Sequence, residues 1–397
     1  MDGRACGAAR FRGVRRSHGA GPLELTRTSR MPTERPNVGC MITAVGAEGD
    51  SDESWYRQII SDAEVAESLG FDAGWIVEHH FSDYQPTPNP IVMLSHIAAR
   101  CPKLGLGTAV IVTPWHQPIR IAEEIAMLSL LTRAPLRIGF GRGNAPLEYE
   151  AFGVAMGEAK DRFEECWDIV QLALKGQPFT YLGQHLQIER EVTMRPFPRM
   201  QQITFVGAIG HPTSAEKIGG YGLAPLVNGG PGLDVHRNIL AQWSDSVRRH
   251  GGNPSLPKIV SPLTIIADTD QEAFQLARRY VPRWYQLQLE HYAFDAVKYA
   301  SVPGYQPFTD GQKRRQAWSN PDNLDPLIEL SFIGSPETVR RKVQAYLDLG
   351  YDYLLLNAST PGMPEHLRHD WLTRFARDVW PYVGRQQTTR KAEVAVA

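Results

Sequence analysis

Short apolar runs alternate with amphipathic segments along most of the chain. Eight runs have the length and composition of buried strands, at residues 37–43, 73–77, 104–111, 136–140, 203–206, 223–227, 259–266 and 353–357. Eight further segments carry apolar residues at helical spacing, at residues 53–69, 90–100, 118–131, 159–174, 213–221, 235–250, 271–280 and 336–349. Strands that alternate with helices predict a parallel sheet. Eight of them favour a closed (β/α)8 TIM barrel over an open doubly wound sheet, which normally needs fewer strands.

The last amphipathic segment carries signals at both of its ends. Ser335 is a typical N-cap, Pro336 suits the first helical position, and Gly350 suits the residue that ends a helix. We therefore expect a helix over residues 336–349.

Two segments do not fit the simple repeat. Residues 176–200 contain a β-like stretch at 184–191, which indicates a small hairpin or excursion before the fifth strand. Residues 281–332 show no clear strand and are rich in aromatic residues and proline. A connection of this length in a compact barrel is typical of a functional lid, and the aromatic residues favour an ordered one.

Composition places the chain among globular proteins. Of its 397 residues 42% are apolar and 21% are charged, and the net charge of −1 gives no reason to expect nucleic acid or an anionic membrane as a partner. No apolar run reaches the roughly 18 residues of a membrane-spanning helix. The cysteines are too scattered for a disulfide framework or a zinc site, which favours reduced thiols and a cytoplasmic protein. They are Cys6, Cys40, Cys101 and Cys166.

The two ends of the chain differ from its body. Residues 1–36 begin with a stretch rich in arginine and glycine that has no apolar periodicity, so we expect a disordered basic tail, or upstream sequence before a true start at Met31. Residues 385–397 are expected to form a second disordered tail. The barrel then occupies residues 37–384, with residues 281–332 as its active-site lid.

The second predicted strand ends in three titratable residues, Glu78, His79 and His80. Active sites of such barrels lie at the carboxyl ends of the strands, so these side chains are candidates for the chemistry. Adjacent side chains of an extended segment point to opposite faces, and therefore only one of the two histidines can face a pocket. That imidazole suits proton transfer near neutral pH. Two neighbouring histidines make a poor metal chelate, and we expect no metal; packing of both against helices is the simpler alternative.

Two other strand ends favour an anion. Arg142 lies between two glycines after the fourth strand, and Gly210 to Ser214 follow the fifth strand and open a helix. Free N–H groups at a helix start and a guanidinium that can approach closely suit a phosphate. Taken singly, the first is more often a plain turn and the second a plain helix cap.

Several stretches together resemble the bacterial luciferase-like flavin monooxygenases. Residues 71–81 read FDAGWIVEHHF and are followed by Asn89 and Pro90. In the same order come LGTAVIV at 106–112, PIRIAEE at 118–124, IGFGRG at 138–143, FG at 152–153 and GSPE at 334–337. The resemblance runs from about Asn37 to Val383. It implies a (β/α)8 barrel with an insertion.

The resemblance also implies a cofactor and roles for particular residues. The cofactor is FMN, used in its reduced form, supplied by a separate reductase. His79 corresponds to an acid/base histidine near the flavin, with His80 behind the site. The implied cofactor-binding residues are Glu78, Ala109, Val110, Arg142, Gly210, His211 and Ser214. Ala109 and Val110 match a place where a non-proline cis peptide is common, and Trp284, Tyr285 and Tyr292 belong to the covering segment.

We therefore expect a monooxygenase that uses reduced FMN and molecular oxygen to oxygenate a small apolar organic substrate, as a homodimer. Gly141 stands where the luciferase α subunit has a reactive cysteine, which argues against light emission. Three alternatives remain open: a deazaflavin-dependent oxidoreductase of the same superfamily, a metal-dependent barrel hydrolase that uses Glu78 and His79, and a flavin-binding protein without turnover.

Overall fold

A closed parallel barrel forms the centre of the computed structural model, which describes residues 35–43, 45, 49–293 and 307–384. Around the barrel the strands follow the order β1 (Asn37–Met41), β12 (Tyr353–Leu356), β9 (Ile259–Ser261), β8 (Ala224–Asn228), β7 (Ile203–Ile209), β4 (Leu136–Gly141), β3 (Gly105–Val112) and β2 (Ala73–Ile76). The strand β1 pairs with both β2 and β12, which closes the ring. The prediction of a (β/α)8 TIM barrel is confirmed, and the open sheet is wrong.

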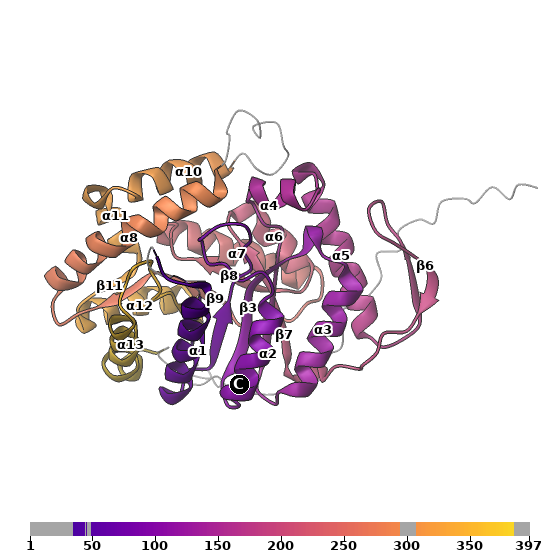
Figure 1. The fold of residues 1–397 in the computed structure, drawn as a ribbon, viewed down its shortest axis with the longest axis horizontal. Helices are drawn as coiled ribbons and strands as arrows, with labels where there is room; N and C mark the ends of the chain where they lie inside the picture. The colour runs from indigo at the N-terminus through magenta and orange to yellow at the C-terminus, as the bar shows by residue number, and fades with distance from the viewer. Residues whose placement is uncertain (1–34, 44, 46–48, 294–306, 385–397) are drawn as a thin grey trace, which may run out of the picture.

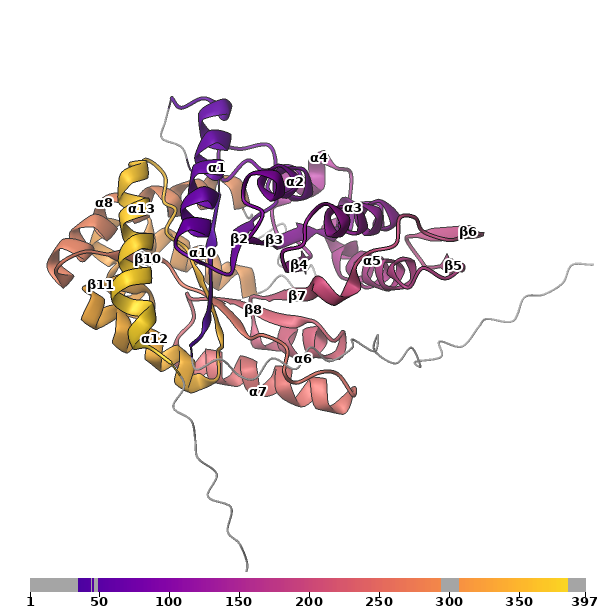
Figure 2. The same cartoon turned by 90° about the horizontal axis from the view of Figure 1, so that it is seen from below.

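Helices surround the strands on the outside of the barrel (Figures 1 and 2). The longer ones are α1 (Asp52–Ser68), α2 (Pro90–Arg100), α3 (Pro118–Leu131), α5 (Ala159–Leu174), α6 (Pro212–Gly220), α7 (Leu233–Arg249), α8 (Asp270–Tyr292), α10 (Pro307–Trp318), α12 (Pro336–Leu349) and α13 (Glu365–Arg374). The short α4 (Pro146–Ala151) and α11 (Asp325–Leu330) and the turn η1 (Thr113–Trp115) lie in connections. Sequence periodicity missed α4 and α13.

The helix α12 begins and ends as its sequence predicts. Ser335 accepts a hydrogen bond from the Thr338 N–H, Pro336 is the first helical residue, and Gly350 follows the helix with a left-handed φ of 111°.

Large side chains fill the barrel interior because small residues face them. Trp75 on β2 is fully buried and donates a hydrogen bond to the Tyr353 hydroxyl at 3.1 Å. A Cβ at Gly107 on the neighbouring β3 would lie 2.3 Å from the Trp75 ring. The glycine is therefore what lets the indole occupy the interior.

The seventh predicted strand is wrong as a single element. Its first part, β9, belongs to the barrel, whereas its second part, β10 (Thr264–Ile266), leaves the barrel and pairs in parallel with β11 (Phe332–Gly334). Periodicity could not show the break because both parts are buried and apolar.

The long connection after β10 is mostly helical where the structure describes it. The helix α8 runs to Tyr292, beyond the predicted end at Tyr280, and α10 and α11 follow before β11. The predicted excursion is a hairpin of the antiparallel strands β5 (Phe179–Leu182) and β6 (Gln187–Val192), which projects from the barrel (Figure 2).

The predicted tails fall almost wholly outside the described residues, which include only Arg35 and Pro36 of the first. Within the described part of the chain, no helix combines the length and the apolar character needed to cross a membrane.

Candidate active site

Glu78 is buried just after β2 and holds the neighbouring loops together. Its Oε1 atom accepts hydrogen bonds from Trp115 Nε1 at 3.0 Å, His116 Nε2 at 2.8 Å and His80 Nε2 at 3.1 Å, and its Oε2 atom accepts one from the Val112 N–H at 2.9 Å. Burial raises the pKa of Glu78, but the hydrogen bonds from His116 and His80 outweigh it and hold that pKa below its ordinary value.

Three of these four donors crowd Oε1 and one reaches Oε2, so most of the acceptor capacity of the Glu78 carboxylate is already in use. The carboxylate is thus engaged in holding loops, a role different from the metal ligand that the hydrolase alternative gives it. Contact between Glu78 and a cofactor stays a prediction.

The two histidines point in different directions, as alternation along an extended segment requires. The Nδ1 atom of His79 lies 3.4 Å from Glu148 Oε1, whereas the His80 ring packs against Trp115 and Phe152. Burial lowers the pKa of His79, and the Glu148 carboxylate only partly offsets it. His79 is therefore mostly neutral near pH 7, with a ring nitrogen able to exchange a proton.

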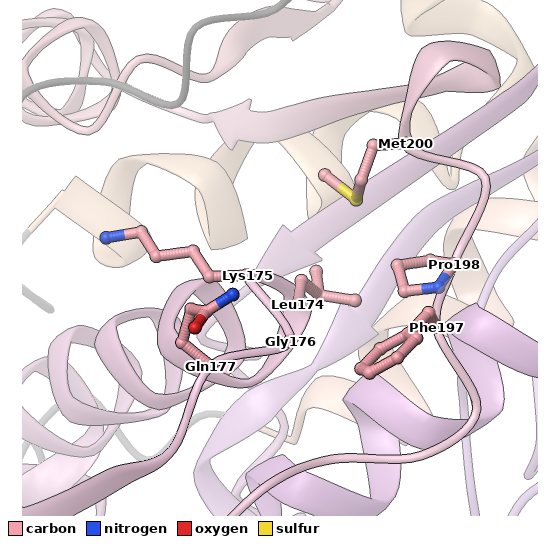
Figure 3. Close-up of a pocket in the computed structure, with 7 residues that line it drawn as sticks. All are labelled: Leu174, Lys175, Gly176, Gln177, Phe197, Pro198 and Met200. Carbon is pink, nitrogen blue, oxygen red and sulfur yellow. The ribbon is translucent and has the colours of Figure 1, made fainter.

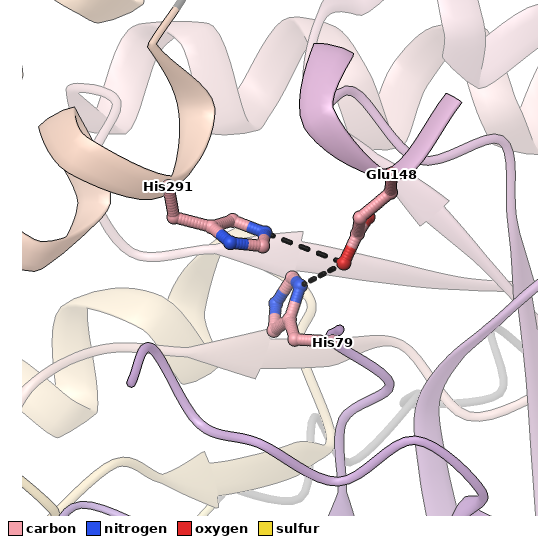
Figure 4. Close-up of side chains that lie close together, drawn as sticks. All are labelled: His79, Glu148 and His291. Carbon is pink, nitrogen blue, oxygen red and sulfur yellow. Dashed lines mark hydrogen bonds and ion pairs between the residues drawn. The ribbon is translucent and has the colours of Figure 1, made fainter. Parts of the chain in front are cut away.

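Glu148 and His291 join His79 at the mouth of the barrel, and sequence reasoning missed both. Glu148 lies on α4 and His291 near the end of α8; both are buried, and His291 Nε2 lies 3.4 Å from Glu148 Oε1 (Figure 4). Burial raises the pKa of Glu148, but the two imidazoles outweigh it and lower that pKa to about 2. The residues lie too far apart in the chain for spacing to connect them.

The candidate phosphate residues follow two neighbouring strands. Arg142 comes directly after β4, and the segment from Gly210 to Ser214 follows β7, which pairs with β4. His211 caps the helix α6, because its ring accepts a hydrogen bond from the Thr213 N–H. Lys217 lies close enough to feel the charge of Arg142: burial and the nearby cations Lys160 and Arg142 lower its pKa.

The strands β3 and β4 pack closely against each other next to the residues that precede Arg142. The Ala109–Val110 peptide is cis, as the resemblance implies for this position. A Cβ at Gly141 would lie 2.4 Å from Val110 Cγ2, so Val110 occupies the space that a cysteine side chain would need. This packing gives a physical reason for the glycine.

The C-terminal end of α8 lies over His79. The Tyr292 hydroxyl is 3.5 Å from His79 Nε2, and the Arg315 guanidinium of α10 lies 4.7 Å from the centre of the Tyr292 ring. Of the three predicted covering residues, Tyr292 therefore contacts His79. Trp284 and Tyr285 lie buried in the same helix and contribute to its packing.

A separate pocket of about 310 Å³ lies away from these residues. Its lining residues come from the end of α5 and from the segment before β7 (Figure 3). Segments that precede a strand lie at the amino ends of the strands, opposite the strand ends described above. Its lining consists of Leu174, Lys175, Gly176, Gln177, Phe197, Pro198 and Met200. Barrels of this type rarely carry chemistry at that end.

Comparison with known proteins decides the family. Residues 37–353 match the family described as luciferase-like monooxygenase. The chain belongs to the luciferase-like monooxygenases. It is accordingly an enzyme of the monooxygenase and oxidoreductase class, and the resemblance seen in the sequence is confirmed.

Two curated relatives illustrate the range of similarity within the luciferase-like monooxygenases. The α chain of alkanal monooxygenase from the Kryptophanaron alfredi symbiont is 22% identical over 299 residues, which are 74% of this chain and 83% of the relative. The uncharacterized protein y4vJ of Sinorhizobium fredii is 38% identical over 138 residues, 35% of this chain and only 39% of that relative.

Two solved structures share the fold. The oxygenating constituent of 3,6-diketocamphane monooxygenase from Pseudomonas putida, a type II Baeyer–Villiger monooxygenase in complex with FMN, is 20% identical with a TM-score of 0.70, over 88% of this chain and 99% of its own. An F420-dependent secondary alcohol dehydrogenase in complex with an F420–acetone adduct is 15% identical with a TM-score of 0.69, over 88% and 100%.

Proposed function

We propose that this luciferase-like enzyme is a flavin-dependent monooxygenase that uses reduced FMN and molecular oxygen to oxygenate a small apolar organic substrate. The observation that carries the proposal is that a half-buried neutral imidazole and a cationic helix start lie at the same end of the barrel. His79 supplies the first, and Arg142 with the start of α6 supplies the second. When bound, reduced FMN supplies the electrons that activate oxygen.

The residues present suit the phosphate of such a cofactor. The N-terminus of α6 carries a partial positive charge, and Arg142 can form two parallel hydrogen bonds to phosphate oxygens. Gly210 has open space where a Cβ would stand, so a phosphate can approach the backbone there. Ser214 in the first turn of α6 adds a hydroxyl donor.

His79 is suited to hold or move a proton beside the cofactor ring. Its Nε2 atom points toward the covering helix α8 and its Nδ1 atom toward Glu148. The rings of Tyr84 and Tyr292 enclose it. Such an enclosure keeps water away from the reacting atoms and suits an apolar substrate.

A second candidate is hydride transfer with the deazaflavin F420. It is favoured by the extra cations Lys160 and Lys217 near Arg142, because the tail of that coenzyme carries more negative charge than FMN. Side-by-side binding of FMN, reduced FMN and F420 distinguishes the two candidates. Tighter binding of F420, with no oxygen consumption in the presence of reduced FMN, would replace the first proposal by the second.

The proposed function includes two protein partners. A separate flavin reductase would supply reduced FMN, in line with a structural relative described as the oxygenating constituent of its enzyme. The second partner is another copy of the chain, in a homodimer. Exposed apolar side chains on α2 and α3, at Val92, Met127 and Leu131, support this proposal.

Replacement of Arg142 tests the cofactor site. We expect Arg142→Ala to weaken FMN binding by about 1.5–3 kcal/mol for each charge-assisted hydrogen bond that it removes, as measured by fluorescence quenching or calorimetry. Arg120→Ala is the matched control, because Arg120 is an exposed residue on α3 that should leave affinity unchanged. Unchanged FMN affinity in Arg142→Ala would place the phosphate elsewhere.

A further inference from the structure

One buried carboxylate at the barrel mouth lies between two imidazoles. The Oε1 atom of Glu148 accepts a hydrogen bond from the His80 N–H at 2.8 Å and lies 3.4 Å from both His79 Nδ1 and His291 Nε2 (Figure 4). The three side chains come from the loop after β2, from α4 and from α8. A single oxygen atom therefore joins three segments that are distant in the sequence.

The partners of each ring assign its protons. Glu148 is ionised because its pKa is about 2, so it only accepts hydrogen bonds. The Nδ1 atom of His79 must then carry the hydrogen, which leaves the lone pair on Nε2. For His291 we infer the reverse. Its Nδ1 lies 2.7 Å from the Ser82 hydroxyl, and its buried Nε2, which has no hydrogen-bond partner among the described residues, faces the ionised Glu148 Oε1 at 3.4 Å and is the nitrogen expected to carry the hydrogen.

The same three side chains offer atoms within 4.8 Å of one another, a set that a metal ion could also use. A carboxylate oxygen that already accepts a hydrogen bond from a backbone N–H is a weaker metal ligand. The Ser82 hydroxyl orients the His291 ring and the His80 N–H orients the Glu148 carboxylate, both without an ion.

We propose that Glu148 is a positioning residue with two tasks at this mouth. It holds His79 in the tautomer whose Nε2 lone pair faces the reaction space, and through His291 it fastens the end of α8 over that space. The acid/base role of His79 rests on the proposed function, whereas the tautomer and the fastening of α8 do not.

In this arrangement the surroundings of His79 depend on the position of the end of α8. His291 is fully buried and immediately precedes Tyr292, whose hydroxyl faces His79 Nε2 at 3.5 Å. If α8 moves away, Glu148 loses the His291 imidazole and His79 loses the Tyr292 hydroxyl. An ionised buried carboxylate is costly without such partners, so docking of α8 and ionisation of Glu148 support each other.

Nitrogen-15 NMR of histidine-labelled protein tests the first task. The titratable groups facing His79 are Glu148, His291, Tyr84 and Tyr292, with the charge of Glu78 nearby. In the wild type we expect His79, assigned by comparison with His79→Gln, to carry its proton on Nδ1. In Glu148→Gln we expect a mixture of tautomers and a lower His79 pKa, because the carboxylate raises that pKa.

Glu150→Gln is the matched control, since Glu150 is an exposed glutamate on the same short helix. A wild-type His79 protonated on Nε2, or a Glu148→Gln spectrum identical to that of Glu150→Gln, would overturn the first task. The wild-type tautomer alone decides this point if a Glu148 variant proves too unstable to study.

Hydrogen–deuterium exchange tests the second task. We expect His291→Gln and Glu148→Gln to speed exchange of the backbone amides of residues 285–292, with Glu150→Gln unchanged. Equal protection in all three variants would overturn the fastening of α8. Metal analysis of the purified protein provides a further check: a stoichiometric divalent metal whose removal abolishes the His79 tautomer would replace the proton network by a metal site.

Kinetics connect the two tasks to turnover. We expect Glu148→Gln to lower kcat by roughly 10²–10⁴-fold with little change in the KM for FMN, as is typical when the group that orients a catalytic histidine is lost. A rise in KM with kcat unchanged would overturn the positioning role. An inactive wild type would contradict the proposed function only, because the NMR and exchange results do not require turnover.

Discussion

Three consecutive titratable side chains at the end of β2 take different positions because their surroundings differ. Glu78 is enclosed by four donors and remains ionised, His79 lies between Glu148 and Tyr292, and His80 packs against aromatic rings while donating to Glu78. Alternation along the chain predicts that the two histidines diverge. Which partners each one meets depends on residues far along the chain, which the sequence pattern does not reveal.

Variants of the two histidines should separate chemistry from stability. We expect His79→Ala to keep FMN bound but to slow oxygenation by ~10²–10⁴-fold, since it removes a proton-transfer group and leaves the phosphate residues intact. His80→Ala should mainly lower the free energy of unfolding, by ~0.5–3 kcal/mol, because it removes a buried donor to Glu78. Product formation with supplied reduced FMN and a thermal melt measure both. If His80→Ala were the stable but inactive variant and His79→Ala the unstable but active one, the acid/base role would belong to His80.

At the scale of elements, the apolar pattern predicts strands and long helices well, because their burial repeats over many residues. It fails where an element is short or where the chain changes direction within an apolar run. The six-residue α4, which carries Glu148, gives too few turns for a helical period. The β9–β10 break lies inside one apolar stretch and depends on pairing with β11, which is distant in sequence.

The close contact between β3 and β4 gives a prediction at this scale. We expect Gly141→Ala to lower the free energy of unfolding by about 1–3 kcal/mol, because its Cβ would meet Val110 at 2.4 Å. Gly157→Ala, where no atom lies within 4 Å of the added Cβ, is the control. Denaturant titration should show that Val110→Ala partly rescues Gly141→Ala; strictly additive effects would contradict the contact.

At the scale of the whole molecule, parallel strands bring all the candidate groups to one end of the barrel. This is why residues after β2, β4 and β7 could be expected at one site from the sequence alone. Glu148 and His291 could not, since the contact of Glu148 with His79 spans 69 residues and depends on how connections fold over the barrel.

Charges buried at that end should make the molecule sensitive to acid. Glu148 has a pKa of about 2 in place of an ordinary 4.5, so its contribution of about 3 kcal/mol is present above pH 4.5 and lost as the pH falls toward 2. Urea unfolding from pH 6 to pH 2 should show most of this loss. Glu148→Gln should have a flatter pH dependence over the same range; an equal slope in both proteins would contradict it.

The pairing of β10 with β11 has a consequence for how the insertion between them is attached to the barrel. The two strands lie in parallel register, Thr264 opposite Phe332 and Ile266 opposite Gly334, so the insertion between them leaves and rejoins within one three-residue strand length, roughly 10 Å. Its ends are held together whatever lies between them, and lengthening such a loop costs little. We therefore expect a graft of residues 267–331 from a relative to refold on the same barrel if the core-facing positions of α8, such as Ala277 and Val281, are kept. A graft that keeps them and still unfolds would contradict this expectation.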